Sequence, residues 1–91
     1  MSRFAQTQMT DKKSSQDRLI HNRHFVPAGD IVIRQGERGD TAYLIQSGKV
    51  RVYTEHEGKT VELGTLTVGD ICGEMALIVD EPRSATVQAL E

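Results

Sequence analysis

The chain has 91 residues and a mass of 10.1 kDa, which is one small domain, and 37% of its residues are apolar or aromatic. Its longest apolar run, Met75–Val79, is too short to span a membrane, and its start lacks the apolar stretch of a signal peptide. Eleven basic and 13 acidic residues give a net charge of −2, which argues against direct binding of nucleic acid. Cys72 is the single cysteine, so no internal disulfide can form. We therefore expect a cytoplasmic protein without membrane insertion.

The first residues, 1–14, are almost entirely polar, and this composition predicts a disordered tail. Ser15 can cap the N-terminus of a short helix over Gln16–Asn22. Leu19 and Ile20 are the only apolar residues of that segment, so the helix needs a partner surface. The folded domain is expected to cover residues 15–91.

From His24 onward, short β-branched and apolar segments alternate with regularly spaced glycines. This spacing predicts a mainly β fold, an antiparallel β-sandwich or jelly roll (a double-stranded β-helix), with a short inserted helix and the short N-terminal helix. Strands are expected at His24–Val26, Ile31–Gln35, Thr41–Ser47, Lys49–Glu55, Thr60–Leu66, Ile71–Cys72 and Ala85–Leu90. Period-two alternation supports several of them. The pairs Gly29-Asp30, Gly39-Asp40 and Gly69-Asp70 predict scaffold turns in which glycine adopts a positive φ.

One segment interrupts the β pattern. Gly73–Ile78 is rich in good helix formers and predicts a helical turn between two strands. The unpaired N–H groups at the start of such a turn, directly after a glycine, can bind an anion. Arg83 can return across this position with a planar fork suited to phosphate oxygens. The Glu74 carboxylate would repel a bare phosphate, but it can accept a hydrogen bond from a hydroxyl group. A sugar hydroxyl next to a phosphate is therefore implied.

The stretch Gly73–Ile78, followed five residues later by Arg83-Ser84-Ala85-Thr86, resembles the phosphate-binding cassette of the cyclic nucleotide-binding domain. The upstream segments Val26–Val32 and Tyr43–Val50 resemble strand and turn signatures of the same family. The resemblance extends from His24 to Leu90. It implies a regulatory module, not an enzyme, that senses a cyclic nucleotide and signals to an effector domain or protein.

The resemblance also implies a role for each residue of the cassette. Arg83 would bind the exocyclic phosphate oxygens, and Glu74 would bind the ribose 2′-hydroxyl. Ser84 would contact either the phosphate or the amino group of guanine. The remaining cassette residues that we expect at the ligand are Gly73, Met75, Ala76, Leu77 and Ala85, with the backbone amides of all of these except Met75 completing the cradle. The expected ligand is cAMP, with cGMP as the second choice, and no cofactor or metal is expected.

Several simpler interpretations compete with this one. Glu74 and Arg83 could form only a structural ion pair, and Leu77 on a helical turn is more typical of core. Cys72 is expected to be a buried, unreactive thiol. The Gly58-Lys59-Thr60 segment is similar to the end of a loop that binds nucleoside triphosphates, but it lacks the first glycine of that motif. His21 and His24 lack a third ligand for a metal, and no residues are found that could carry catalysis.

Members of the resembled family usually continue beyond the position of Leu90 with a further strand and with helices that cover the base. We expect this chain to lack both, which would leave a sheet edge that a partner or an oligomer completes. The alternative function is therefore an interaction scaffold of the same fold with a vestigial pocket. Intact Glu74 and Arg83 favour the nucleotide-sensing function.

Overall fold

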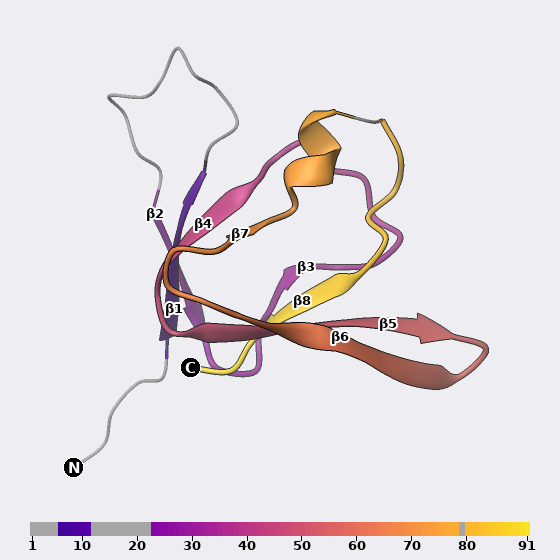
Figure 1. The fold of residues 1–91 in the computed structure, drawn as a ribbon, viewed down its shortest axis with the longest axis horizontal. Coiled ribbons are helices and arrows are strands. Elements are labelled where there is room, and N and C mark those ends of the chain that lie inside the picture. Colours follow the sequence, from indigo (N-terminus) through magenta and orange to yellow (C-terminus); the bar gives the residue numbers. More distant parts are fainter. Residues whose placement is uncertain (1–5, 12–22, 79) are drawn as a thin grey trace.

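The computed structural model describes residues 6–11, 23–78 and 80–91, and these residues form eight strands and one short helical turn (Figure 1). The elements in chain order are β1 (Gln6–Asp11), β2 (Arg23–Pro27), β3 (Ile31–Ile33), β4 (Tyr43–Ser47), β5 (Lys49–His56), β6 (Lys59–Thr67), β7 (Ile71–Cys72), the 3₁₀ turn η2 (Glu74–Leu77) and β8 (Thr86–Ala89). All seven strands expected from the sequence are present, with ends that agree to within two residues.

The strands form two four-stranded sheets with the orders β2-β1-β4-β7 and β3-β8-β5-β6, and every neighbouring pair is antiparallel. The predicted antiparallel β-sandwich is therefore confirmed. Because side chains alternate along a strand, each sheet turns one row of apolar residues towards the interior. The core cluster consists of Ile33, Ile45, Val50, Cys72 and Val87. Ile45 and Val50 are completely buried.

The β5–β6 hairpin extends away from the rest of the molecule (Figure 1). Its turn has Glu57 at a φ of 53° and Gly58 at a φ of 78°. Two successive residues with positive φ are typical of the tight turn that matches the twist of an antiparallel hairpin. Arg51 of β5 and Glu62 of β6 form an ion pair across the hairpin, and the Arg51 guanidinium lies over the Tyr53 ring.

The prediction of a disordered tail over residues 1–14 is wrong for Gln6–Asp11. These residues form β1, which pairs with β2 along one edge and with β4 along the other. Backbone hydrogen bonds on both edges satisfy the polar groups of the segment, and they do so independently of its polar side chains. The expected helix over Gln16–Asn22 lies outside the described residues.

The helical turn between β7 and β8 is confirmed as the 3₁₀ turn η2. Gly73 precedes it with a φ of 80°, a left-handed conformation that glycine adopts without steric cost. Since β7 pairs with β4 of one sheet and β8 pairs with β3 and β5 of the other, the segment between them bridges the two sheets.

Candidate functional site

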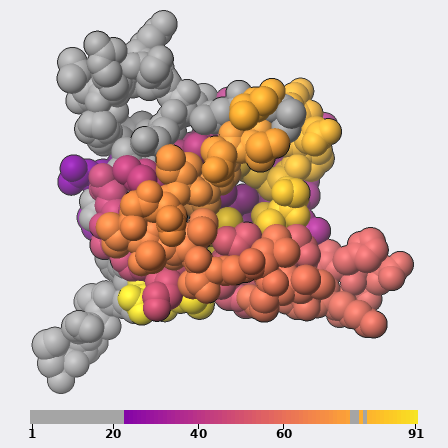
Figure 2. Space-filling model, in the orientation of Figure 1, coloured from indigo at the N-terminus to yellow at the C-terminus, as the bar shows by residue number. Residues whose placement is uncertain are grey.

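A pocket of about 350 Å³ opens between the two sheets beside η2. In Figure 2 the surface is hollowed between the orange residues around β7 and η2 and the yellow residues around β8. A volume of this size is within the usual range for small-molecule sites. The lining residues are Ile33, Val52, Leu63, Leu66, Ile71, Cys72, Gly73, Glu74, Met75, Glu81, Pro82, Arg83, Ser84, Ala85 and Val87.

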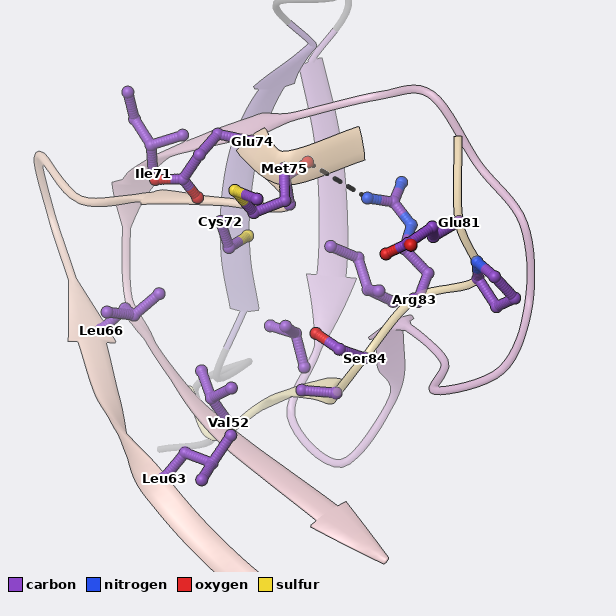
Figure 3. Close-up of a pocket in the computed structure, with 15 residues that line it drawn as sticks. Val52, Leu63, Leu66, Ile71, Cys72, Glu74, Met75, Glu81, Arg83 and Ser84 are labelled. Atoms are coloured by element: carbon purple, nitrogen blue, oxygen red, sulfur yellow. Dashed lines mark hydrogen bonds between the residues drawn. The ribbon is translucent and has the colours of Figure 1, made fainter. Parts of the chain in front are cut away.

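The two ends of the pocket differ in polarity. Val52, Leu63 and Leu66 of the β5–β6 hairpin lie away from Arg83 and form an apolar end (Figure 3). Cys72 lines the pocket beside Glu74 and Met75 (Figure 3). Burial raises the pKa of its thiol to about 11, and the nearby Glu74 carboxylate adds to this shift. A pKa in this range predicts a neutral thiol at physiological pH. The expectation of a buried cysteine is confirmed, and its low reactivity stays a prediction.

Arg83 defines the polar end of the pocket. Its Nη1 group donates a hydrogen bond of 3.2 Å to the carbonyl oxygen of Gly73 (Figure 3), and its Nη2 group donates one of 2.8 Å to the carbonyl oxygen of Thr41. A guanidinium has five N–H donors. Two carbonyls therefore fix its position and leave three donors for a ligand.

Two glycines make room for this guanidinium. A Cβ atom on Gly39 would lie 2.8 Å from Arg83 Nη2, and one on Gly73 would lie 2.9 Å from Arg83 Nη1. Gly69 and Gly29 have the positive φ predicted for the Gly-Asp turns, but Gly39 does not, so that interpretation is wrong for Gly39. A side chain at position 39 would prevent the close approach of this backbone to the Arg83 guanidinium.

The backbone of Arg83 is anchored to the loop between β3 and β4. Its N–H donates to the carbonyl of Glu37, and its own carbonyl accepts from the N–H of Gly36, both at 2.8 Å. On the surface, Arg38 pairs with Asp80 at 2.9 Å, and both side chains are largely exposed. The β3–β4 loop and the segment before β8 are thus held together at several points.

Glu74 and Arg83 do not form the structural ion pair that was the simpler interpretation of the motif. Glu74 is exposed and lines the pocket, whereas the Arg83 guanidinium donates to two backbone carbonyls. The Glu74 carboxylate can therefore accept a hydrogen bond from a bound molecule.

The structure brings most of the predicted site residues to one place. Six of them line the pocket: Gly73, Glu74, Met75, Arg83, Ser84 and Ala85. The backbone of Ala76 and Leu77 continues η2, and the side chains of both lie outside the described part of the structure. The sequence reasoning missed Gly39 and Thr41, which no local pattern connects to Arg83. It also missed the apolar end of the pocket, although period-two alternation in β5 offered a signal for Val52.

Residues 23–91 match the family of the cyclic nucleotide-binding domain. The chain belongs to this family. It is 40% identical over 91 residues to a cAMP-dependent protein kinase regulatory subunit of Candida albicans, covering the whole chain and 17% of that protein. It is 38% identical over 82 residues to the cGMP-dependent protein kinase egl-4 of Caenorhabditis elegans, covering 82% of this chain and 10% of that protein.

Solved structures of this family show the same fold. The catabolite activator protein of Thermus thermophilus superposes with a TM-score of 0.73 at 38% identity, covering 77% of this chain and 33% of that one. The cAMP-bound form of the EAL enzyme Bd1971 superposes with a TM-score of 0.67 at 42% identity, covering 70% of this chain and 17% of that one. The chain thus spans a third or less of these four proteins, and within them it corresponds to a regulatory binding module. None of the helices in the described residues is long and apolar enough to cross a membrane.

Proposed function

We propose that this domain binds cAMP in the pocket beside η2 and that occupancy of the pocket is passed to an effector. The observation that carries the proposal is the Arg83 guanidinium, which two carbonyls hold at the polar end of an otherwise largely apolar pocket. A cationic fork with three remaining donors suits an anionic group with several oxygens, and the apolar end suits the faces of a purine.

In this proposal, the cassette residues contact different parts of the ligand. Arg83 donates to the exocyclic phosphate oxygens, and the backbone N–H groups of Gly73, Ala76, Leu77 and Ala85 add further donors. Glu74 accepts the hydrogen bond of the ribose 2′-hydroxyl. Met75 and Ser84, which also line the pocket, contact the nucleotide beside them.

The preference for cAMP over cGMP rests on the polarity of the far end of the pocket. Val52, Leu63 and Leu66 offer no side-chain hydrogen-bond partner there. Guanine carries an exocyclic carbonyl and an exocyclic amino group, whereas adenine carries one exocyclic amino group, and burying such groups without partners is unfavourable. Adenine presents fewer polar groups to the same surface. The regulatory subunit that matches the whole chain is itself named cAMP-dependent, which agrees with this preference.

The role in signalling is supported by the relatives, which are regulatory subunits or kinases that contain this domain as a small part. A ligand shifts the equilibrium of an effector only if it binds one of its conformations more tightly. In this domain, a phosphate on Arg83 would act on a side chain that already connects the β3–β4 loop with the start of η2.

The proposal is tested by titrating the wild-type chain, Arg83→Ala and Arg38→Ala with cAMP and cGMP in a calorimeter. Arg38 is the matched control because it is an exposed arginine in an ion pair outside the pocket lining. Loss of a charge-assisted hydrogen bond of about 1.5–3 kcal/mol lowers affinity by one to two decades in Arg83→Ala. Arg38→Ala retains wild-type affinity, and equal affinities for all three proteins would contradict the role of Arg83.

A thermal-shift series with each nucleotide distinguishes sensing from the scaffold function. A ligand at 100 times its dissociation constant stabilises the fold by about 2.7 kcal/mol. The melting temperature is expected to rise with cAMP at lower concentration than with cGMP. No shift with either nucleotide at millimolar concentration would favour a scaffold with a vestigial pocket.

A further inference from the structure

The β5–β6 hairpin loses its neighbouring strand before it reaches its tip. Strand β5 continues to His56, but its pairing with β8 ends at Tyr53↔Thr86. Figure 1 shows the rest of the hairpin extending away from the two sheets. A hairpin of two strands is only marginally stable in water when nothing else holds it. The orientation of this hairpin therefore depends on contacts at the point where β8 begins.

The side chain of Gln35 makes such a contact. Its Nε2 group donates a hydrogen bond of 3.1 Å to the Glu55 carbonyl, and its Oε1 atom accepts one of 2.8 Å from the Glu55 N–H. A carboxamide carries a donor and an acceptor side by side. Gln35 thus gives Glu55 the reciprocal pair of hydrogen bonds that another residue of a neighbouring antiparallel strand would give.

The backbone around Gln35 is fixed to both neighbouring parts of the pocket wall. The Gln35 N–H donates a hydrogen bond of 3.0 Å to the hydroxyl oxygen of Thr86, a buried residue at the start of β8. The N–H of the next residue, Gly36, donates to the Arg83 carbonyl at 2.8 Å. Two consecutive residues therefore connect the segment that carries Arg83 with the hairpin that carries the apolar end of the pocket.

We propose that Gln35 is a positioning residue that holds the β5–β6 hairpin against the base of a bound cyclic nucleotide. Val52 and Leu63 of the hairpin line the pocket at the end away from Arg83 (Figure 3), whereas Gln35 is outside the lining and acts through Glu55. This inference rests on the proposed nucleotide binding. Without the Gln35 contact the hairpin adopts other orientations for part of the time, and the apparent dissociation constant rises as the binding-competent fraction falls.

A role in positioning is distinct from a general contribution to folding. Both hydrogen bonds between Gln35 and Glu55 are exposed to solvent. Water can replace exposed partners when the bonds are lost, so the stability of the whole domain changes little. The distal hairpin is affected more, because β8 does not extend along it. The expected effect is therefore local to the hairpin and to the ligand contacts that the hairpin makes.

The first test is a calorimetric titration of the wild type and Gln35→Met with cAMP. Methionine keeps the length of the side chain and removes the carboxamide. The dissociation constant of Gln35→Met is expected to rise about tenfold. Gln46→Met is the matched control, because Gln46 is a half-buried glutamine of β4 outside the pocket lining, and it should retain the wild-type affinity. Equal affinities of the wild type and Gln35→Met would overturn the inference.

A double-mutant cycle with Leu63→Ala shows whether Gln35 acts through the hairpin. Leu63 is 58% exposed, so its truncation leaves the core intact. If Gln35 positions Leu63 at the base, the two substitutions are not additive, and Gln35→Met costs less than about threefold in affinity when Leu63 is already alanine. An undiminished effect in that background would show that Gln35 influences binding by another route and would contradict the proposal.

Amide hydrogen exchange without nucleotide separates this inference from the proposed function. In Gln35→Met the amides of residues 54–61 should exchange about tenfold faster than in the wild type, while those of Ile45 and Val87 in the core are unchanged. Uniform acceleration, or none in the hairpin, would refute the positioning role. Failure of the wild type to bind cAMP would refute the proposed function and the inference with it, whereas normal binding by Gln35→Met would refute the inference alone.

Discussion

Replacing Gly39 with alanine tests whether the position of the Arg83 guanidinium governs nucleotide binding. The new Cβ atom would lie 2.8 Å from Arg83 Nη2, whereas ordinary van der Waals contact begins at 3.4 Å. The guanidinium must therefore move by about 0.6 Å, the difference between these two distances. Such a shift weakens its 2.8 Å hydrogen bond to the Thr41 carbonyl or turns it away from the ligand.

Gly39→Ala is expected to lose binding free energy equal to that of about one charge-assisted hydrogen bond, about 1.5–3 kcal/mol. This loss raises the dissociation constant for cAMP by a factor of about ten to over one hundred. Folding stability should change by less than about 1 kcal/mol. Gly39 has no positive φ, so alanine fits its backbone, and the reduced entropy of the unfolded chain offsets part of the disturbance. The substitution is thus expected to separate binding from folding.

Calorimetric titration with cAMP measures the first effect, and urea unfolding measures the second. Gly58→Ala is the matched control because Gly58 has a φ of 78° at the tip of a hairpin and no atom lies within 4 Å of the position that an alanine Cβ would take. Alanine there costs about 1–2 kcal/mol of stability through backbone strain and leaves the affinity unchanged. If Gly39→Ala binds cAMP within twofold of the wild type, the guanidinium in this position does not contact the phosphate.

Three further predictions concern the core, the hairpin and the pocket. In urea unfolding, Ile45→Ala should lower the free energy of unfolding by about 2–5 kcal/mol, because Ile45 is completely buried. Val61→Ala, at a side chain that is 50% exposed, should change it by less than about 1 kcal/mol, and similar losses in the two variants would contradict the assigned core. Arg51 lowers the pKa of Glu62 below its ordinary value of 4.5, mainly through their hydrogen bond. The ionised Glu62 carboxylate therefore stabilises the fold above pH 4.5, and this stabilisation disappears as the pH falls through the pKa of the folded state. Acid titrations of the wild type and Glu62→Gln should therefore converge below pH 4.5, and parallel curves would refute this contribution. Iodoacetamide should alkylate Cys72 slowly at about pH 8 and faster towards pH 11, and saturating cAMP should suppress the reaction. Mass spectrometry measures the extent of alkylation, and a fast reaction at the lower pH would contradict a buried neutral thiol.

The cassette shows how much of the site short sequence patterns can predict. Gly73 before a run of helix formers predicted a turn, and the structure has a 3₁₀ turn starting at Glu74. Arg83 was predicted beside that turn, and its guanidinium donates to the Gly73 carbonyl. The turn follows from local conformational preferences, and the placement of Arg83 was inferred from the motif spacing and the family resemblance.

The sequence by itself determined the strands of residues 23–91, the turn between β7 and β8, and most of the residues from Gly73 to Ala85 that line the pocket, since alternation and turn propensity act over a few residues. Only the tertiary structure decided that Gly39 and Thr41 lie against Arg83, about forty positions along the chain, and that Gln6–Asp11 completes a sheet. These contacts depend on which strands pair across long separations. Such pairing is selected by the burial and hydrogen bonding of the whole sandwich, and the composition of any one segment does not encode it.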